Sequence, residues 1–226
     1  MARIRKPLRR RRSPEVAKLE ILDAADRVFA GSQPDQVGLK EVARAAGVSH
    51  ALVTHYYGSY AALIEAVLER RVRGLREKIL VKLQEPGVLG RPAELISVLF
   101  HALDEPVHLR LMRWLLASER PAAAHAFAFR DQGLHQVAQS IGAALTPDAP
   151  ALLIVQIELA LATAVSAAYG YALAKHALVG ALGRRTTKDL DTQVQTTLAT
   201  MLQLHLRAQL AAAGREIPEG SAGSGH

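Results

Sequence analysis

Five neighbouring residues of this chain offer side chains that suit contact with another molecule: Ser49, His50, Ala51, Thr54 and His55. The serine, the threonine and the histidines carry hydrogen-bonding groups, whereas the alanine offers only a methyl group. On a helix that begins after Ser49, residues 50, 51, 54 and 55 share one face, because positions three or four apart are neighbours. This spacing favours binding of a partner through hydrogen bonds and methyl contacts.

The residues that enzymes use for bond-making chemistry form no comparable set in the sequence. The chain has no cysteine, which excludes disulfides and thiolate metal sites and leaves the redox compartment open. It also lacks a phosphate-cradling Gly-Lys-Ser/Thr loop, a His-Glu-x-x-His motif and a Gly-x-Ser-x-Gly motif. The nine histidines show no convincing ligand spacing. We therefore expect a protein that is not an enzyme and that holds no cofactor and no metal.

The segment 39–57 has the pattern of two short helices packed around a tight turn. Gly47 can adopt the positive φ that ends the first helix, and Ser49 can cap the second. The residues expected to face inward are Val42, Ala43, Val48, Leu52 and Val53. This is the pattern of a helix-turn-helix, whose second helix enters the major groove of DNA. The predicted partner is therefore a double-stranded DNA operator.

Positive charge is concentrated near the start of the chain, which suits binding of a polyanion. Residues 1–60 hold 11 Lys or Arg against 6 Asp or Glu, whereas residues 61–226 hold 17 against 15. Residues 1–12 should form a mobile basic arm that places Arg3 and Arg5 along phosphates or in a minor groove. The base edges should be contacted by His50, Ala51 and Thr54. The expected phosphate contacts are Lys40, Arg44, Ser49, His55, Tyr56 and Tyr60.

The first helix of the chain has a clear start. Ser13 can cap it and Pro14 fits its first position, while Gly31 is expected to end it. The predicted apolar stripe is Val16, Leu19, Leu22, Ala25 and Phe29. Residues 33–38 should form a loop before the helix-turn-helix.

Helical spacing continues through the rest of the chain, and no segment alternates with period two. A long helix should run from the cap at Ser59 to the break at Pro86, followed by helices near 92–103, 106–119, 121–145, 149–182 and 187–213. We therefore expect an all-α fold of about nine helices: an N-terminal three-helix helix-turn-helix domain, joined by a long helix to a larger helical domain. The predicted parts are a disordered arm 1–12, a DNA-binding domain 13–58, a body 59–214 and a disordered tail 215–226.

The body is expected to form the dimer and to bind a ligand. Helices 149–182 and 187–213 have apolar faces wide enough to build a four-helix bundle in a homodimer, although each could simply cover its own core. A small-molecule effector should occupy a mostly apolar pocket. The candidate ligand-binding residues are His101, Arg110, Arg113, Trp114, His125, Phe127, Phe129, Glu158 and Tyr169. Each also has an ordinary interpretation, such as Trp114 in the core or Arg110 in solvent.

One stretch of the body could be mistaken for a membrane span. Residues 151–174 are mostly apolar but include Gln156 and Glu158, which are costly in lipid. The basic N-terminus lacks the apolar run of a secretory signal. We expect a buried or intersubunit helix, no membrane partner and a cytoplasmic location.

Residues 18–68 resemble the N-terminal domain of the TetR family of transcriptional regulators. The residues that carry the resemblance are Ile21, Leu22, Ala24, Ala25, Phe29, Val42, Ala43, Ala46, Gly47, Val48, Ser49, Tyr57, Ser59 and Leu63. The resemblance implies a homodimer that represses transcription until a small molecule enters its C-terminal domain. Three positions depart from the family pattern: Gly38 stands in place of a Thr, Thr54 in place of a Tyr, and Tyr60 in place of a phosphate-binding Lys.

A different function also fits the basic arm. The chain could coat DNA or a membrane surface without reading sequence and without any effector. Equal binding to random DNA and to the DNA upstream of its own reading frame would distinguish this function from operator recognition.

Overall fold

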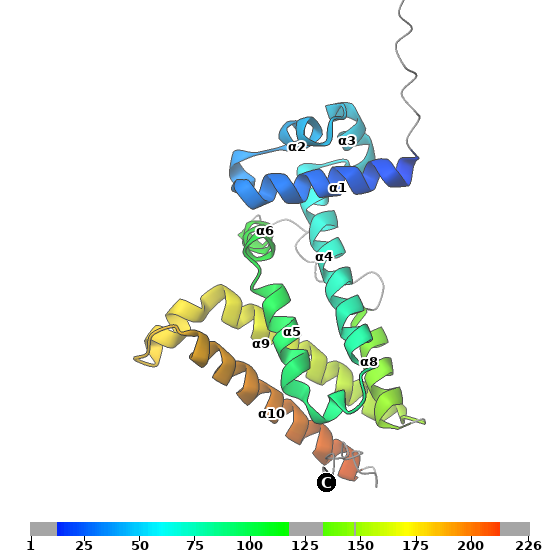
Figure 1. Ribbon diagram of the computed structural model, residues 1–226, viewed down its shortest axis with the longest axis vertical. Helices are drawn as coiled ribbons and strands as arrows, with labels where there is room; N and C mark the ends of the chain where they lie inside the picture. Colours follow the sequence, from blue (N-terminus) through cyan, green and yellow to red (C-terminus); the bar gives the residue numbers. More distant parts are fainter. Residues whose placement is uncertain (1–12, 118–132, 147, 213–226) are drawn as a thin grey trace, which may run out of the picture. The chain divides into compact units, whose positions relative to one another are not determined.

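The computed structural model describes residues 13–117, 133–146 and 148–212, and every regular element in these ranges is a helix. They contain nine α-helices and two short 3-10 helices (Figure 1). This confirms the predicted all-α fold. The described chain divides into two compact units, with the division between Val67 and Leu68. The predicted arm 1–12, the whole predicted tail 215–226 and residues 118–132 lie outside the described residues.

Unit 1 begins with α1 (Pro14–Gly31), which starts as its sequence predicts. Ser13 Oγ accepts a hydrogen bond from the Val16 N–H at 3.3 Å, and Pro14 occupies the first turn. Gly31 belongs to the helix, which ends at Ser32 in an extended conformation, so the predicted stop was one residue early.

The predicted apolar stripe of α1 was only partly right. Its buried residues are Ala17, Ile21, Ala24, Ala25 and Phe29. Val16 and Leu19 are 45% and 55% exposed. The predicted stripe and the observed buried residues both have helical spacing, so the spacing alone does not decide which of them is buried. The helix that packs against α1 decides it. That partner is α2 (Leu39–Ala46), which lies against α1, and the alanines on the buried face allow the two helices to approach closely.

The turn between α2 and α3 (His50–Tyr57) has the predicted glycine geometry. Gly47 has φ 65°, its N–H donates to Arg44 O at 3.2 Å, and the Val48 N–H donates to Ala43 O at 3.0 Å. This pair of bonds is the Schellman arrangement that satisfies the last carbonyls of a helix. Ser49 then caps α3, because its Oγ accepts from the Leu52 N–H at 3.2 Å.

The first turns of α4 (Tyr60–Lys82) belong to unit 1. Ala61, Leu63, Ile64 and Val67 are buried there, and the Tyr60 ring meets the Phe29 ring edge-on at 6.1 Å. The boundary of the first unit therefore falls after Val67, within α4, rather than after Gly58 as the sequence suggested.

Unit 2 contains the rest of α4 and the helices that follow it. These are η2 (Val88–Gly90), α5 (Pro92–Leu103), α6 (Pro106–Ala117), α8 (Gly133–Leu145), α9 (Ala151–Ala181) and α10 (Lys188–Ala212). Pro92 and Pro106 open their helices, where the missing N–H costs no hydrogen bond. The predicted bounds were close for each described helix, and the first part of the predicted segment 121–145 lies outside the described residues.

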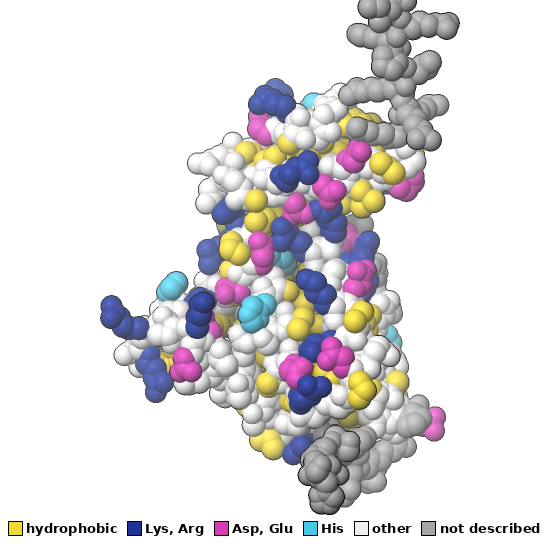
Figure 2. Space-filling view, viewed as in Figure 1, with side chains coloured by type: hydrophobic (Ala, Val, Ile, Leu, Met, Phe, Trp, Pro, Cys, Tyr) yellow, Lys and Arg dark blue, Asp and Glu magenta, His cyan; other side chains and the backbone are white. Residues whose placement is uncertain are grey.

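The core of unit 2 lies where α8 and α9 cross, with α5 and α10 packed on α9 (Figure 1). Gly142 on α8 makes the crossing close, because a Cβ at this position would overlap Ile154 Cδ1 and lie 3.2 Å from Ala149 Cβ. Acidic and basic side chains are interspersed over the visible face of the protein (Figure 2). This mixture agrees with the nearly balanced charge of residues 61–226.

Among the described residues, α9 is the one helix long and apolar enough to cross a membrane by length and composition. One side of it packs on α5, α8 and α10, as in the core helix of a folded domain. The other side leaves Leu152, Val155 and Leu159 exposed. This helix therefore presents two apolar sides, of which its own unit covers one.

Candidate nucleic-acid interface and internal cavity

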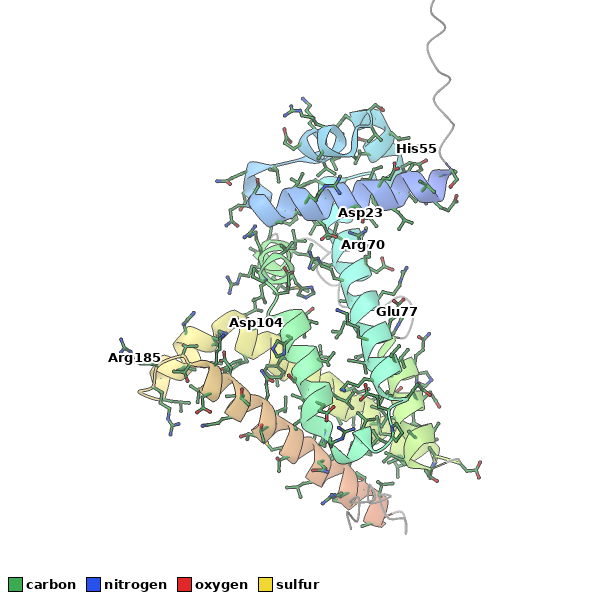
Figure 3. All side chains as sticks on the ribbon, viewed as in Figure 1. Asp23, His55, Arg70, Glu77, Asp104 and Arg185 are labelled. Carbon is green, nitrogen blue, oxygen red and sulfur yellow. The ribbon has the colours of Figure 1, made fainter. Side chains whose placement is uncertain are left out.

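The outer face of α3 carries the residues that the sequence assigned to base contact. His50, Ala51, Thr54 and His55 are exposed, whereas Val53 on the opposite side is fully buried. His55 lies on α3 at the surface of unit 1 (Figure 3). Thr54 Oγ1 donates to His50 O at 3.1 Å. Since the hydroxyl proton is used within its own helix, Thr54 offers a partner its methyl group and a hydroxyl oxygen that can only accept.

Two cations lie on α2, the helix before the turn. Lys40 and Arg44 are both exposed and stand four residues apart, so they share one face of α2. Ser49 is exposed as well, although its hydroxyl oxygen already accepts the capping hydrogen bond of α3. The backbone N–H groups at this helix start remain suited to a phosphate oxygen.

The C-terminal end of α3 is fixed to α1 by two tyrosines. The Tyr57 hydroxyl donates to Lys18 O at 3.0 Å. Tyr56 is half-buried, with Lys18 Nζ 5.6 Å from its ring centre and the His55 ring at 5.3 Å. Lys18 was missed from the sequence, because nothing in the spacing of α1 indicates that residue 18 meets the end of α3.

The role predicted for Tyr60 needs correction. Its hydroxyl donates to Pro34 O at 2.8 Å, so its single proton is used inside unit 1 and does not point to a phosphate. Burial raises the pKa of the Tyr60 phenol, and the negative charges of Asp35 and Glu41 raise it further. Tyr60 therefore fixes the loop before α2. Arg3 and Arg5 lie outside the described residues.

Unit 2 contains an internal cavity of about 100 Å³ between α4, α5, α8 and α9. Its walls are almost entirely aliphatic, and its polar lining residues are Arg76 on α4 and Tyr169 on α9. Tyr169 is buried, and its hydroxyl is 2.8 Å from His108 Nε2 on α6. The two rings also stack, with their centres 5.7 Å apart.

Burial determines the protonation of this histidine–tyrosine pair. It lowers the pKa of His108 to about 4, the Arg71 charge lowers it as well, and Glu105 opposes both. His108 is therefore neutral at pH 7. Burial also raises the pKa of Tyr169, so the tyrosine keeps its proton. The pair is linked to α4, because Glu105 Oε2 accepts from the His108 N–H at 2.9 Å and pairs with Arg71 Nη1 at 2.6 Å.

Of the ligand-binding residues predicted from the sequence, only Tyr169 lines this cavity. His101 is exposed, and its Nδ1 lies 2.7 Å from Ser97 O on the same helix. Glu158 pairs with His135 at 2.5 Å on an exposed face of α8 and α9. Arg110 and Trp114 are half-buried on α6, and Arg113 is exposed. These five residues do not line the cavity, because polar and aromatic residue types do not indicate a cavity with aliphatic walls, and their role in ligand binding stays a prediction. His125, Phe127 and Phe129 lie outside the described residues.

Comparison with known proteins agrees with this architecture. The family model described as bacterial regulatory proteins, tetR family, matches residues 21–67. An HTH-type transcriptional regulator of Mycobacterium tuberculosis is 34% identical over 144 residues, which are 62% of this chain and 68% of that protein. The chain belongs to the TetR family. It is therefore a DNA-binding helix-turn-helix transcriptional regulator, and this family is not one of enzymes.

Solved TetR-type structures share the fold beyond the DNA-binding unit. A tetR-family transcriptional regulator from Streptomyces coelicolor has a TM-score of 0.60 at 24% identity and covers 88% of this chain and 86% of its own. The fatty acid degradation regulator FadR from Bacillus halodurans has a TM-score of 0.53 at 15% identity, covering 83% and 96%. At these identities the likeness concerns the fold alone. The TetR family comprises soluble transcription regulators, which is consistent with a cytoplasmic location.

Proposed function

We propose that this TetR-family protein is a homodimeric repressor that a small molecule releases from a near-palindromic operator. The observation that carries the proposal is the aliphatic cavity in unit 2 of a chain whose unit 1 contains the exposed second helix of a helix-turn-helix. Mostly apolar cavities with few polar groups are the usual form of small-molecule sites. A ligand that bound the cavity better in one conformation than in another would shift the protein toward that conformation.

The homodimer is proposed to form through α9 and α10, as predicted for 149–182 and 187–213. Several large apolar side chains are exposed: Leu152, Val155, Leu159 and Leu178 on α9, Leu182 directly after α9, and Met201 and Leu204 on α10. A soluble protein rarely leaves so many large apolar side chains of two adjacent helices in water. A two-fold pairing of α9 and α10 would cover them in a four-helix bundle.

The operator contacts are proposed from the exposed residues of α2 and α3. His50, Ala51 and the Thr54 methyl group would meet base edges, with the two methyl groups suited to thymine. Phosphates would be contacted by Lys40, Arg44, His55, Tyr56 and the backbone N–H groups after Ser49, and also by Arg3 and Arg5 of the arm. Two such units would read half-sites about 34–36 Å apart or further.

Footprinting and salt titration test the DNA-binding part of the proposal. The full chain should protect two related half-sites in the intergenic DNA beside its own reading frame, and it should bind this DNA more tightly than random DNA of equal length. Deleting residues 1–12 should flatten the slope of log K against log salt by about 0.9 for each phosphate contact that is lost. Equal affinity for random DNA would instead favour a protein that coats nucleic acid without reading sequence.

A further inference from the structure

Unit 2 contains a second cavity, of about 110 Å³, between α5, α8, α9 and α10. It differs from the cavity between α4, α5, α8 and α9, which we call the first cavity, because α10 contributes to its walls and α4 does not. The α10 residues that line the second cavity are Leu202, Gln203 and Leu206, which lie on one side of that helix. The proposed function makes no use of this second cavity.

The second cavity has mainly aliphatic walls. Among its lining residues in the described chain, none carries a formal charge and none is aromatic. A buried water molecule needs several polar partners, which aliphatic walls do not offer. An aliphatic space that water does not fill leaves its lining atoms without contacts on one side. A molecule that enters it therefore gains dispersion contacts and removes its own apolar surface from water.

Gln203 gives this cavity its polar group. It is half-buried, and its carboxamide can both donate and accept a hydrogen bond. In the part of the chain that the structure describes, this carboxamide has no hydrogen-bonding partner. A ligand with a hydroxyl or carbonyl group would supply one without displacing an existing contact of the protein.

Charge and size limit what the second cavity can hold. An ion would lose its hydration without meeting an opposite charge, and a molecule with many hydroxyl groups would leave most of them unpaired. An engineered apolar cavity of about 150 Å³ takes up benzene. The smaller volume of about 110 Å³ therefore suits an occupant of roughly six non-hydrogen atoms.

We propose that the second cavity is a binding site for a small neutral molecule with an apolar body and one hydroxyl or carbonyl group. The body lies among the aliphatic side chains of α5, α8 and α9, and the polar group forms a hydrogen bond with the Gln203 carboxamide. This inference goes beyond the proposed function, because the site is separate from the cavity assigned to the effector.

Methyl NMR of the full chain with labelled isoleucine side chains locates the ligand. Ile157 lines the second cavity only, and Ile79 lines the first cavity only. The probe is cyclopentanol, with methylcyclopentane and cyclopentylammonium as its apolar and cationic analogues of equal size. Cyclopentanol and methylcyclopentane should each shift the Ile157 Cδ1 signal in a saturable way, whereas cyclopentylammonium should not. The Ile79 signal reports separately on binding in the first cavity.

The variant Gln203→Met tests the hydrogen bond. It should weaken cyclopentanol about 3-fold to 10-fold, which corresponds to one neutral hydrogen bond, and it should not weaken methylcyclopentane. Binding of methylcyclopentane also shows that the variant is folded. The matched control is Gln193→Met, which changes an exposed glutamine of the same helix that does not line the cavity, and it should affect neither ligand.

The variant Ala160→Leu tests the location of the apolar body. Ala160 on α9 lines the second cavity only, so a larger side chain there should abolish the Ile157 shift with both ligands. Val165 on the same helix lines the first cavity only, and Val165→Leu should leave that shift unchanged.

Three results would overturn the inference: no saturable shift of Ile157, a shift of Ile79 alone, or a Gln203→Met variant that weakens cyclopentanol and methylcyclopentane equally. Each of them would leave the proposed function standing, because release from the operator is assigned to the first cavity.

Discussion

At the scale of single residues, His108 should make stability depend on pH. It is 2% exposed and bonded to Tyr169, with Glu105 and Arg71 nearby. In the folded state its pKa is about 4, whereas the unfolded chain binds this proton near pH 6.5. Between these values only the unfolded state takes up the proton, so stability is lost as the pH falls through the window. Above about pH 7.5 the histidine is almost entirely neutral in both states and contributes little pH dependence.

We expect the free energy of unfolding to fall by about 2 kcal/mol from this group between pH 7 and pH 5. Chemical denaturation at the two pH values measures the change. The double variant His108→Leu, Tyr169→Phe removes the titrating group without leaving a buried polar partner, and it should lose correspondingly less stability over the same interval. An equal loss in wild type and double variant would show that other groups cause it.

A second residue-scale prediction concerns Gly38, which begins α2 without a capping side chain. Glu41 Oε2 accepts from the Gly38 N–H at 2.9 Å, so one half of a capping box is present. Gly38 has φ −153°, an extended conformation open to any residue, and an added Cβ would meet Glu41 Oε2 at an ordinary 3.5 Å. Gly38→Thr should complete the box and raise the free energy of unfolding by about 0.5–1 kcal/mol. Thermal denaturation would measure this gain, and Gly38→Ala would show how much of it arises from the lost backbone freedom alone.

At the scale of elements, the crossing of α8 and α9 depends on Gly142. The position is buried and a Cβ there would overlap Ile154 Cδ1, which is itself buried in the core. Gly142→Ala should therefore destabilise the protein by roughly 1–3 kcal/mol, although alanine favours a helix more than glycine does. Gly74→Ala on α4 is the matched control, because nothing lies within 4 Å of its Cβ position, and it should be neutral or stabilising. Denaturant unfolding of the two variants measures both free energies of unfolding. Similar changes in the two variants would argue against a tight crossing of α8 and α9.

The ends of the helices were predicted well because local chemistry determines them. Ser13, Ser49 and Ser59 each accept a backbone N–H at a helix start, and Gly47 takes the positive φ that ends α2. These effects need no information about distant residues. The buried face of α1 was predicted less well, because Val16 and Ala17 stand on adjacent faces and only the position of α2 decides which one is covered.

The sites were harder to predict than the elements. The exposed face of α3 followed from one helix, so His50, Ala51, Thr54 and His55 could be assigned from spacing. The cavity in unit 2 is formed by helices far apart in the sequence and by residues such as Leu95 and Ile141, whose types are those of any core. Tyr60 was misassigned because its partner, Pro34 O, is a backbone atom that no pattern of side chains reveals.

At the scale of the whole molecule, the apolar sides of α9 and α10 should decide whether the protein can bind an operator. Leu159 is 56% exposed near the middle of the apolar side of α9. In a two-fold bundle, Leu159→Glu would bury a carboxylate without a partner, and even a buried neutral polar group costs roughly 2–7 kcal/mol. The dimer dissociation constant should therefore rise at least about 30-fold.

Light scattering at micromolar concentration should then show wild type as a dimer and Leu159→Glu as a monomer with unchanged helix content. The affinity of Leu159→Glu for the operator should fall as the dimer is lost, because one helix-turn-helix unit reads too few base pairs to bind a site alone. Val81→Glu is the matched control, since Val81 is also exposed but lies on α4, away from the proposed bundle. A Leu159→Glu protein that remains dimeric and protects both half-sites would place the dimer interface elsewhere on unit 2.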